Sequence, residues 1–204
     1  MKKILAIVMA MAVIVSPSAQ SLTDNYNKIY AGWNSMGFED TDADNLNGFN
    51  VGYAYAFNIT GHAVPLFLEV GAEYNYVSHD YDGNKNKASN VTIPVLVTYK
   101  FGNEKINFAP FLGEGICCWT TLKDGDIDCF DIKDSKGDKV FNRVQALFYA
   151  GFNIGFAKHF NVGYRYAYSE TKMAKDISEK VGDITNYSDS KNNYVSTIYF
   201  SVNF

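Results

Sequence analysis

Several charged residues in this sequence lie within otherwise apolar segments, where the fold could bury them. Buried carboxylates and cations persist only when they are paired with each other. We therefore expect six side chains to share one enclosed polar space with Arg143 near its rim, and they are Lys28, Glu69, Glu73, Lys100, Glu114 and Arg165.

Three cysteines, Cys117, Cys118 and Cys129, are the second set. Oxidising compartments outside the cytoplasm permit disulfides, and Cys129 follows the adjacent pair by a short stretch of chain. The hypothesis is a bridge from Cys129 to Cys118, favoured if Glu114 points inward, or else to Cys117. The alternative is three free thiols.

Acidic residues at alternate positions form the third set, Asp124, Asp126 and Asp128. Calcium loops use such spacing, with Gly at loop position six and a bidentate Glu at position twelve. Cys129 and Ser135 stand at those positions here, so a solvated acidic loop is the favoured interpretation. We predict no metal site and no cofactor.

Catalytic motifs are sparse. His62, His79 and His159 fall in predicted turns and loops. No strand is predicted to place a serine and a carboxylate beside any of them, whereas a hydrolytic triad needs that proximity. No Gly-rich phosphate loop leads from a strand into a helix. The chain is predicted not to be an enzyme.

The elements that must position these residues are strands. In the last stretch, Tyr194, Ile198, Phe200, Val202 and Phe204 share one parity, and this period of two indicates a strand with one apolar and one wetter face. Similar patterns predict eight strands, at 25–36, 48–59, 66–77, 91–101, 106–119, 144–156, 160–168 and 193–204.

The connections between these strands alternate between long and short, as in outer-membrane barrels with short periplasmic turns and long outer loops. We predict an all-β fold, an eight-stranded antiparallel up-and-down transmembrane barrel. Glu69 and Glu73 lie mid-strand and must face the lumen. In the irregular fifth strand we place Glu114 inward, with Phe111, Gly113 and Cys117 outward.

The N-terminus has the pattern of a signal peptide, with basic Lys2 and Lys3, an apolar core and small residues before Ala19. We predict a signal peptide at 1–19 and a barrel domain at 20–204. The formal net charge of the 204 residues is −4, and removal of the two lysines makes it more negative. That charge argues against nucleic acid as a partner.

Several motifs carry a resemblance to a known family. They are Ile93 to Phe101, Ala109 to Gly115, Val162 to Tyr166 and the terminal Phe204. The chain resembles the small eight-stranded outer-membrane barrels, OmpA/OmpX-like in shape, and above all the outer-membrane β-barrel domain proteins of Bacteroidetes. The resemblance implies an outer-membrane location, contact with membrane lipid and lipopolysaccharide, and insertion by the barrel assembly machinery with Phe204 as the assembly signal. The cysteines are not part of the pattern.

The expected function is that of a monomeric integral outer-membrane barrel with a side-chain-filled lumen and a structural or surface-loop binding and adhesion role. A narrow porin or ion path and a lipid-modifying outer-membrane enzyme are the alternatives, and a soluble lipid-carrying barrel is the competitor from another class. A short helix at 173–181 in the last outer loop is a further hypothesis, because Met173, Ile177 and Val181 would share one face.

Overall fold

A computed structural model describes residues 22–39, 44–61, 63–81, 84–134, 136–156, 159–174 and 192–204. The predicted signal peptide at 1–19 and residues 175–181 of the predicted helix lie outside these ranges. Eight long strands make up the fold: β1 (Tyr26–Phe38), β2 (Leu46–Asn58), β3 (Leu66–Tyr81), β4 (Asn84–Tyr99), β6 (Ile106–Asp124), β8 (Val144–Phe156), β9 (Phe160–Ser169) and β10 (Asn193–Asn203). Short elements are the two-residue strands β5 (Phe101–Gly102) and β7 (Ile127–Asp128) and a 3-10 turn, η1 (Cys129–Asp131).

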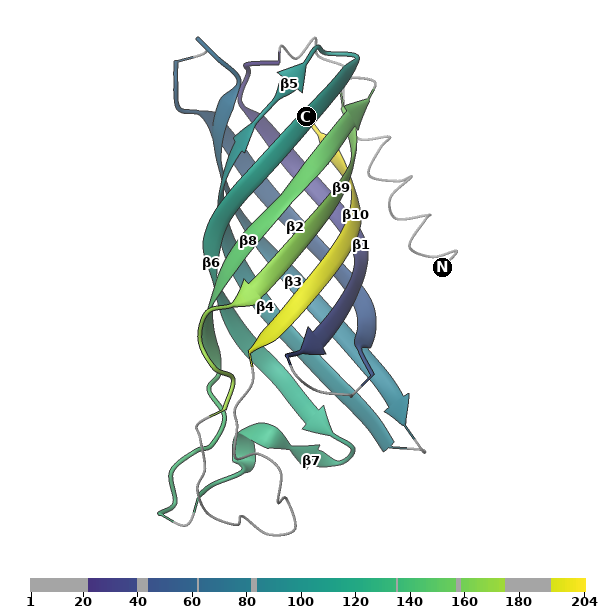
Figure 1. The fold of residues 1–204 in the computed structure, drawn as a ribbon, viewed down its shortest axis with the longest axis vertical. Coiled ribbons are helices and arrows are strands. Elements are labelled where there is room, and N and C mark those ends of the chain that lie inside the picture. The colour runs from purple at the N-terminus through teal and green to yellow at the C-terminus, as the bar shows by residue number, and fades with distance from the viewer. Residues whose placement is uncertain are drawn as a thin grey trace.

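The eight long strands form a closed antiparallel barrel (Figure 1). Each strand pairs with the next long strand along the chain, and β10 closes the barrel by pairing with β1 from Phe38↔Asn193 to Lys28↔Asn203. Beyond that ladder, the Asn27 N–H donates to the Phe204 carbonyl at 2.8 Å and the Phe204 N–H donates to the Asn27 carbonyl at 3.0 Å. The predicted closing strand is therefore paired through its last residue.

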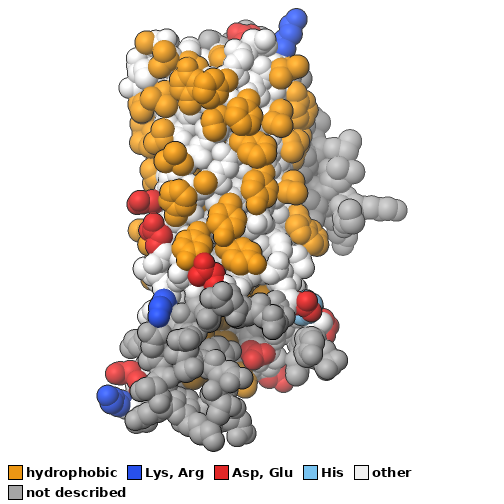
Figure 2. Space-filling model, viewed as in Figure 1, with side chains coloured by type: hydrophobic (Ala, Val, Ile, Leu, Met, Phe, Trp, Pro, Cys, Tyr) orange, Lys and Arg blue, Asp and Glu red, His pale blue; other side chains and the backbone are white. Residues whose placement is uncertain are grey.

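Alternation of side chains produces an apolar outer face and a mostly polar lumen. Tyr53, Val162 and Ile198, for example, are 47%, 43% and 62% exposed, while the intervening Ala54, Gly163 and Tyr199 are buried. Apolar side chains cover much of the barrel wall visible in Figure 2. An apolar band around a closed barrel matches the hydrocarbon layer of a bilayer.

Strands extend well past the apolar band at the outer end. The sequence predicted a long polar loop at 78–90, but β3 and β4 continue through it as a hairpin, pairing His79 with Asn86. Likewise, β6 continues to Asp124 and pairs with β7. Water solvates both faces of a strand outside the membrane, so these extensions have polar residues on both faces. They therefore lack the alternating pattern from which the strands were predicted. No helix among the described residues is long and apolar enough to span a bilayer.

The predicted facing of β6 is wrong. Glu114 is exposed on the outer face, directly opposite Val95 on β4 and Phe148 on β8, whereas Phe111 and Cys117 are buried inside. The Phe111 ring fits inward because it lies over Gly151, where an added Cβ would come within 2.5 Å of the ring. Gly113 shares the inward parity. The cost of a carboxylate in lipid had favoured the opposite assignment, but packing of the lumen decides the parity.

Candidate functional site

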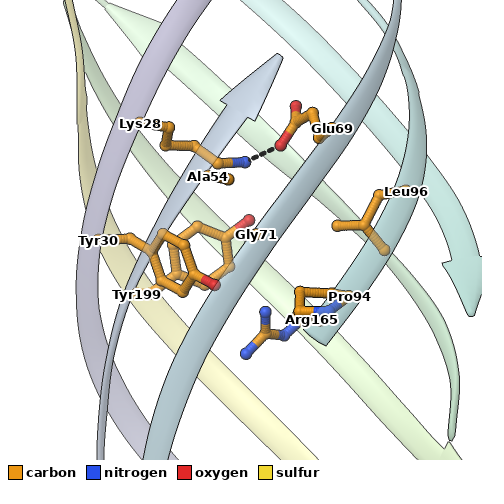
Figure 3. A pocket seen from close by; sticks show the side chains of 9 residues that line it. All are labelled: Lys28, Tyr30, Ala54, Glu69, Gly71, Pro94, Leu96, Arg165 and Tyr199. Carbon is orange, nitrogen blue, oxygen red and sulfur yellow. Dashed lines mark hydrogen bonds and ion pairs between the residues drawn. The ribbon is translucent and has the colours of Figure 1, made fainter. Parts of the chain in front are cut away.

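The lumen holds two ion pairs, each with one glutamate of β3. Nearer the periplasmic end, Lys28 of β1 forms an ion pair with Glu69, and the Tyr26 hydroxyl donates to the same carboxylate at 2.6 Å. All three side chains are buried. Figure 3 shows the Lys28 ammonium pointing at Glu69 beside the rings of Tyr30 and Tyr199.

The second pair joins Arg165 of β9 to Glu73, with 2.5 Å between Nη2 and Oε2. Tyr30 donates to the same oxygen at 3.0 Å, while Thr92 and Asn75 donate to the other oxygen at 2.8 and 3.1 Å. A buried carboxylate that accepts several charge-assisted hydrogen bonds is fixed in place. Amides and hydroxyls continue this network toward the outer end, through Asn34, Asn90 and Thr197.

Lys100 is the third cation of the lumen, and it has no carboxylate of its own. Its Nζ lies 3.6 Å from the centroid of the Tyr26 ring and 4.6 Å from that of Phe67. The side chain is 9% exposed. Since Glu114 faces outward, the lumen has three cations and two carboxylates among its described residues, so Lys100 is held by cation–π contacts.

Little free space remains between these side chains. A cavity lined by Lys28, Tyr30, Glu69, Arg165 and Tyr199, among others, has a volume of about 10 Å³ (Figure 3). That is about the room that one water molecule needs. An eight-stranded barrel is just wide enough for side chains to fill it, and the described part of this lumen is filled in that way.

An apolar layer that the sequence analysis missed covers the outer end of the lumen. We call it the outer cap, and its buried members are Trp119, Leu122, Phe130, Val140, Phe141 and Met173. They pack on Met36, Val77 and Ala88 at the outer ends of β1, β3 and β4. The signal in the sequence was the presence of isolated apolar residues inside a loop rich in Asp and Lys.

Hydrogen bonds and stacking tie the outer cap to the barrel. The Trp119 indole N–H donates to Gln145 Oε1 at 2.6 Å, and Phe141 forms a β-bridge with Ala174. Arg143, predicted near the rim, is exposed there with its guanidinium carbon 4.2 Å from the centroid of the Phe130 ring.

The three cysteines are free. Cys117 and Cys129 are buried in the same apolar cluster as the outer cap, while Cys118 is exposed on the outside of β6. The predicted Cys118–Cys129 bridge is wrong, because the parity that turns Glu114 outward also turns Cys118 away from Cys129.

The acidic loop residues serve local structure. The Asp128 carboxylate accepts from the Phe130 N–H at 3.0 Å and so caps η1, while Asp124 and Asp126 are exposed. In the described part of the chain, no group of three or more His, Cys, Asp or Glu side chains could hold a metal ion.

His79, expected in a loop, lies near the outer end of β3 with its Nε2 3.6 Å from Asp44 Oδ2. This acid–imidazole pair was not expected. Neither residue has a hydrogen bond to a serine or cysteine among the interactions found for the described residues. His159 instead bonds through Nδ1 with the Asn203 carbonyl at 2.9 Å, which fixes the last turn to the closing strand.

Several solved structures share this fold at low sequence identity. The outer membrane enzyme PagL matches with a TM-score of 0.56 at 13% identity, over 86% of this chain and 98% of that one. Neisserial surface protein A matches with 0.54 at 12%, over 88% and 97%. The attachment invasion locus protein Ail of Yersinia pestis matches with 0.51 at 13%, over 89% and 99%.

A search of curated proteins finds no match to the chain. The family model for the outer membrane protein beta-barrel domain matches residues 5–204, nearly the whole sequence. With the closed barrel and its apolar band, this places the protein in the outer membrane, and the chain belongs to the outer membrane protein beta-barrel domain family.

Proposed function

We propose that this protein is a sealed barrel that presents its outer loops as a binding surface for proteins outside the cell. The outer cap is the observation that carries the proposal. It covers the end of the lumen and also gives the loop between β6 and β8 a fixed apolar base, with Phe130 fully buried and Val140 2% exposed.

The loop surface above that base has charges of both signs. The exposed side chains of this loop include basic and acidic residues interspersed along the chain, namely Lys123, Lys133, Lys136, Lys139 and Arg143 with Asp124, Asp126, Asp131 and Asp138. A polyanion such as a glycan sulfate or nucleic acid favours a surface dominated by cations. A surface of mixed charge favours a protein partner, where complementary charges set specificity and on-rate.

Adhesion of cells that display the protein tests this proposal. We expect the cells to bind at least one surface in a panel coated with acidic, basic and neutral proteins, and to bind heparin-coated surfaces no better than cells without the protein. Reversing Lys133, Lys136 and Lys139 to Glu should abolish the gain. A matched control exchanges the charges of the periplasmic turn, Glu104→Lys with Lys105→Glu, and should leave adhesion unchanged.

Equal adhesion of all these cells would overturn the proposal. Stronger adhesion to heparin than to the proteins would show that the partner is a polyanion and not a protein, with the outer loops still the binding surface.

A narrow ion path is the second candidate function, and the filled lumen argues against it. An ion would have to pass the outer cap and two ion pairs, and the cavity beside those pairs has a volume of only about 10 Å³. Purified protein in planar bilayers should therefore give no unitary conductance. Conductance steps that vanish in Phe130→Trp, which enlarges a buried side chain of the outer cap, would favour the path.

A further inference from the structure

Glu114 is a carboxylate on the lipid-facing side of the barrel. It lies between Leu112 and Ile116 on β6, which are 60% and 55% exposed. Its direct cross-strand neighbours are Val95 on β4 and Phe148 on β8, and paired residues of antiparallel strands point to the same face. Outward apolar residues continue along β6 on both sides, so Glu114 lies inside the apolar band and not at its edge.

No cation of this chain meets Glu114 among the described residues. Lys28, Lys100 and Arg165 point into the lumen, and the remaining described bases lie in turns, in loops or at the outer ends of strands. A charged side chain that faces lipid near the bilayer centre is expensive, and such residues commonly mark functional sites. The energetic cost of Glu114 therefore calls for a partner inside the membrane.

The surface around Glu114 on β4 and β6 is mainly aliphatic. We call it the aliphatic face, formed by Val91, Ile93, Val95, Val97, Leu112 and Ile116, which are 40% to 60% exposed. The Phe148 ring on β8, directly opposite Glu114, borders this face and is 38% exposed. Aromatic girdles lie at the two membrane interfaces, so the aliphatic face lies between them, in the hydrocarbon layer.

We propose that the aliphatic face is a dimer interface at which Glu114 meets Glu114 of a second copy. A two-fold axis along the membrane normal places the same residue of both copies at the same depth. A protonated carboxyl group both donates and accepts a hydrogen bond, so it is complementary to its own copy. Polar side chains join transmembrane segments in this way, and two carboxyl groups in contact readily hold a proton between them. A second copy thus satisfies Glu114 without a cation, which the described residues do not place on that surface.

Cys118 provides a native probe for the dimer. It is exposed on the same face of β6, four residues beyond Glu114, while Cys117 and Cys129 are buried. A spin label on Cys118 of the protein in lipid vesicles should give a defined distance between copies by double electron–electron resonance. This signal should persist as lipid is added until the protein is diluted below its dissociation constant.

Three variants separate the proposal from chance association. Glu114→Gln keeps a self-complementary hydrogen-bonding group and should retain the dimer. Glu114→Leu should weaken association about tenfold, within the range of polar contacts between membrane segments. The control variant combines Glu114→Leu with Ile198→Glu, which moves the carboxylate to β10, and it should not restore the distance at Cys118. Native mass spectrometry of unlabelled protein checks that the label itself does not drive pairing.

A monomer in the wild type by both methods, or a dimer of equal strength in Glu114→Leu, would overturn the proposal. Photocross-linking from position 95 in native membranes to a different protein, without any self-association, would assign the aliphatic face to that protein instead.

Discussion

Arg165 and Glu73 join opposite walls of the barrel, with 2.5 Å between the guanidinium Nη2 and the carboxylate Oε2. Their strands, β9 and β3, are separated by three long strands on either path around the barrel. The contact is therefore a brace across the lumen, and Tyr30, Thr92 and Asn75 complete the hydrogen bonding of the carboxylate.

Arg165→Leu should lower the free energy of unfolding by about 3–5 kcal/mol, because it leaves the Glu73 carboxylate buried without its cation. The double variant Arg165→Leu with Glu73→Leu should recover much of this loss, since no unpaired charge remains. Denaturant titration in lipid vesicles, followed by the mobility shift of the folded barrel on gels, measures both. A double variant as unstable as the single one would show that the pair stabilises the barrel by packing and not by neutralising the Glu73 charge.

Lys28 and Lys100 should differ sharply in their response to removal of charge. Lys28→Met strips Glu69 of its ion pair and should cost about 3–5 kcal/mol. Lys100→Met removes only contacts with the Tyr26 and Phe67 rings, of about 0.5–2 kcal/mol, and it also relieves the burial of an unpaired cation. The same unfolding titration compares them. Equal losses would mean that Lys100 also stabilises the Glu69 carboxylate.

Strand positions followed directly from the sequence wherever one face meets lipid. In β2 and β9 large apolar side chains alternate with small or polar ones across the band, so the outward facing of Tyr53 and Tyr164 is unambiguous. The positions of Glu69 and Glu73 followed from the same rule, because a strand with two mid-strand carboxylates on one face must turn that face inward.

Glu114 broke the rule that predicted Glu69 and Glu73. On β6 the cost of placing the Glu114 carboxylate in lipid opposes the gain from packing Phe111 over Gly151 inside the lumen. The sequence shows the carboxylate but not the packing, so it could not predict which side of the strand faces inward. The outer cap was hidden for another reason. Phe130, the adjacent Val140 and Phe141, and Met173 come from separate stretches of the chain and have no period, so only the folded barrel brings them together.

Thiol reactivity checks the arrangement of the cysteines. In the folded barrel only Cys118 should react with a bulky maleimide, and all three thiols should react after denaturation without a reductant. Burial, followed by the nearby carboxylates of Asp124 and Asp128, raises the pKa of the Cys129 thiol to about 11. Its thiolate is therefore scarce at pH 8, and the thiolate is the reactive form. One reactive thiol in the denatured, unreduced protein would instead reveal a bridge.

Tyr164→Arg tests the lipid face of the barrel. Tyr164 is 36% exposed and lies opposite Ile198 on β10 and Phe152 on β8, both exposed apolar residues. An arginine at that depth should cost about 2–4 kcal/mol, whereas the cost falls to about 0–1 kcal/mol near the interfaces. Tyr168→Arg is the matched control, because Tyr168 has the same outward parity near the outer end of β9, where its hydroxyl accepts from Asn192 at 2.7 Å. Unfolding titrations of the two variants in the same vesicles should give a clearly larger loss for Tyr164→Arg. Equal losses, or a larger loss for Tyr168→Arg, would place the centre of the hydrocarbon layer nearer the outer end of β9 than the apolar band indicates.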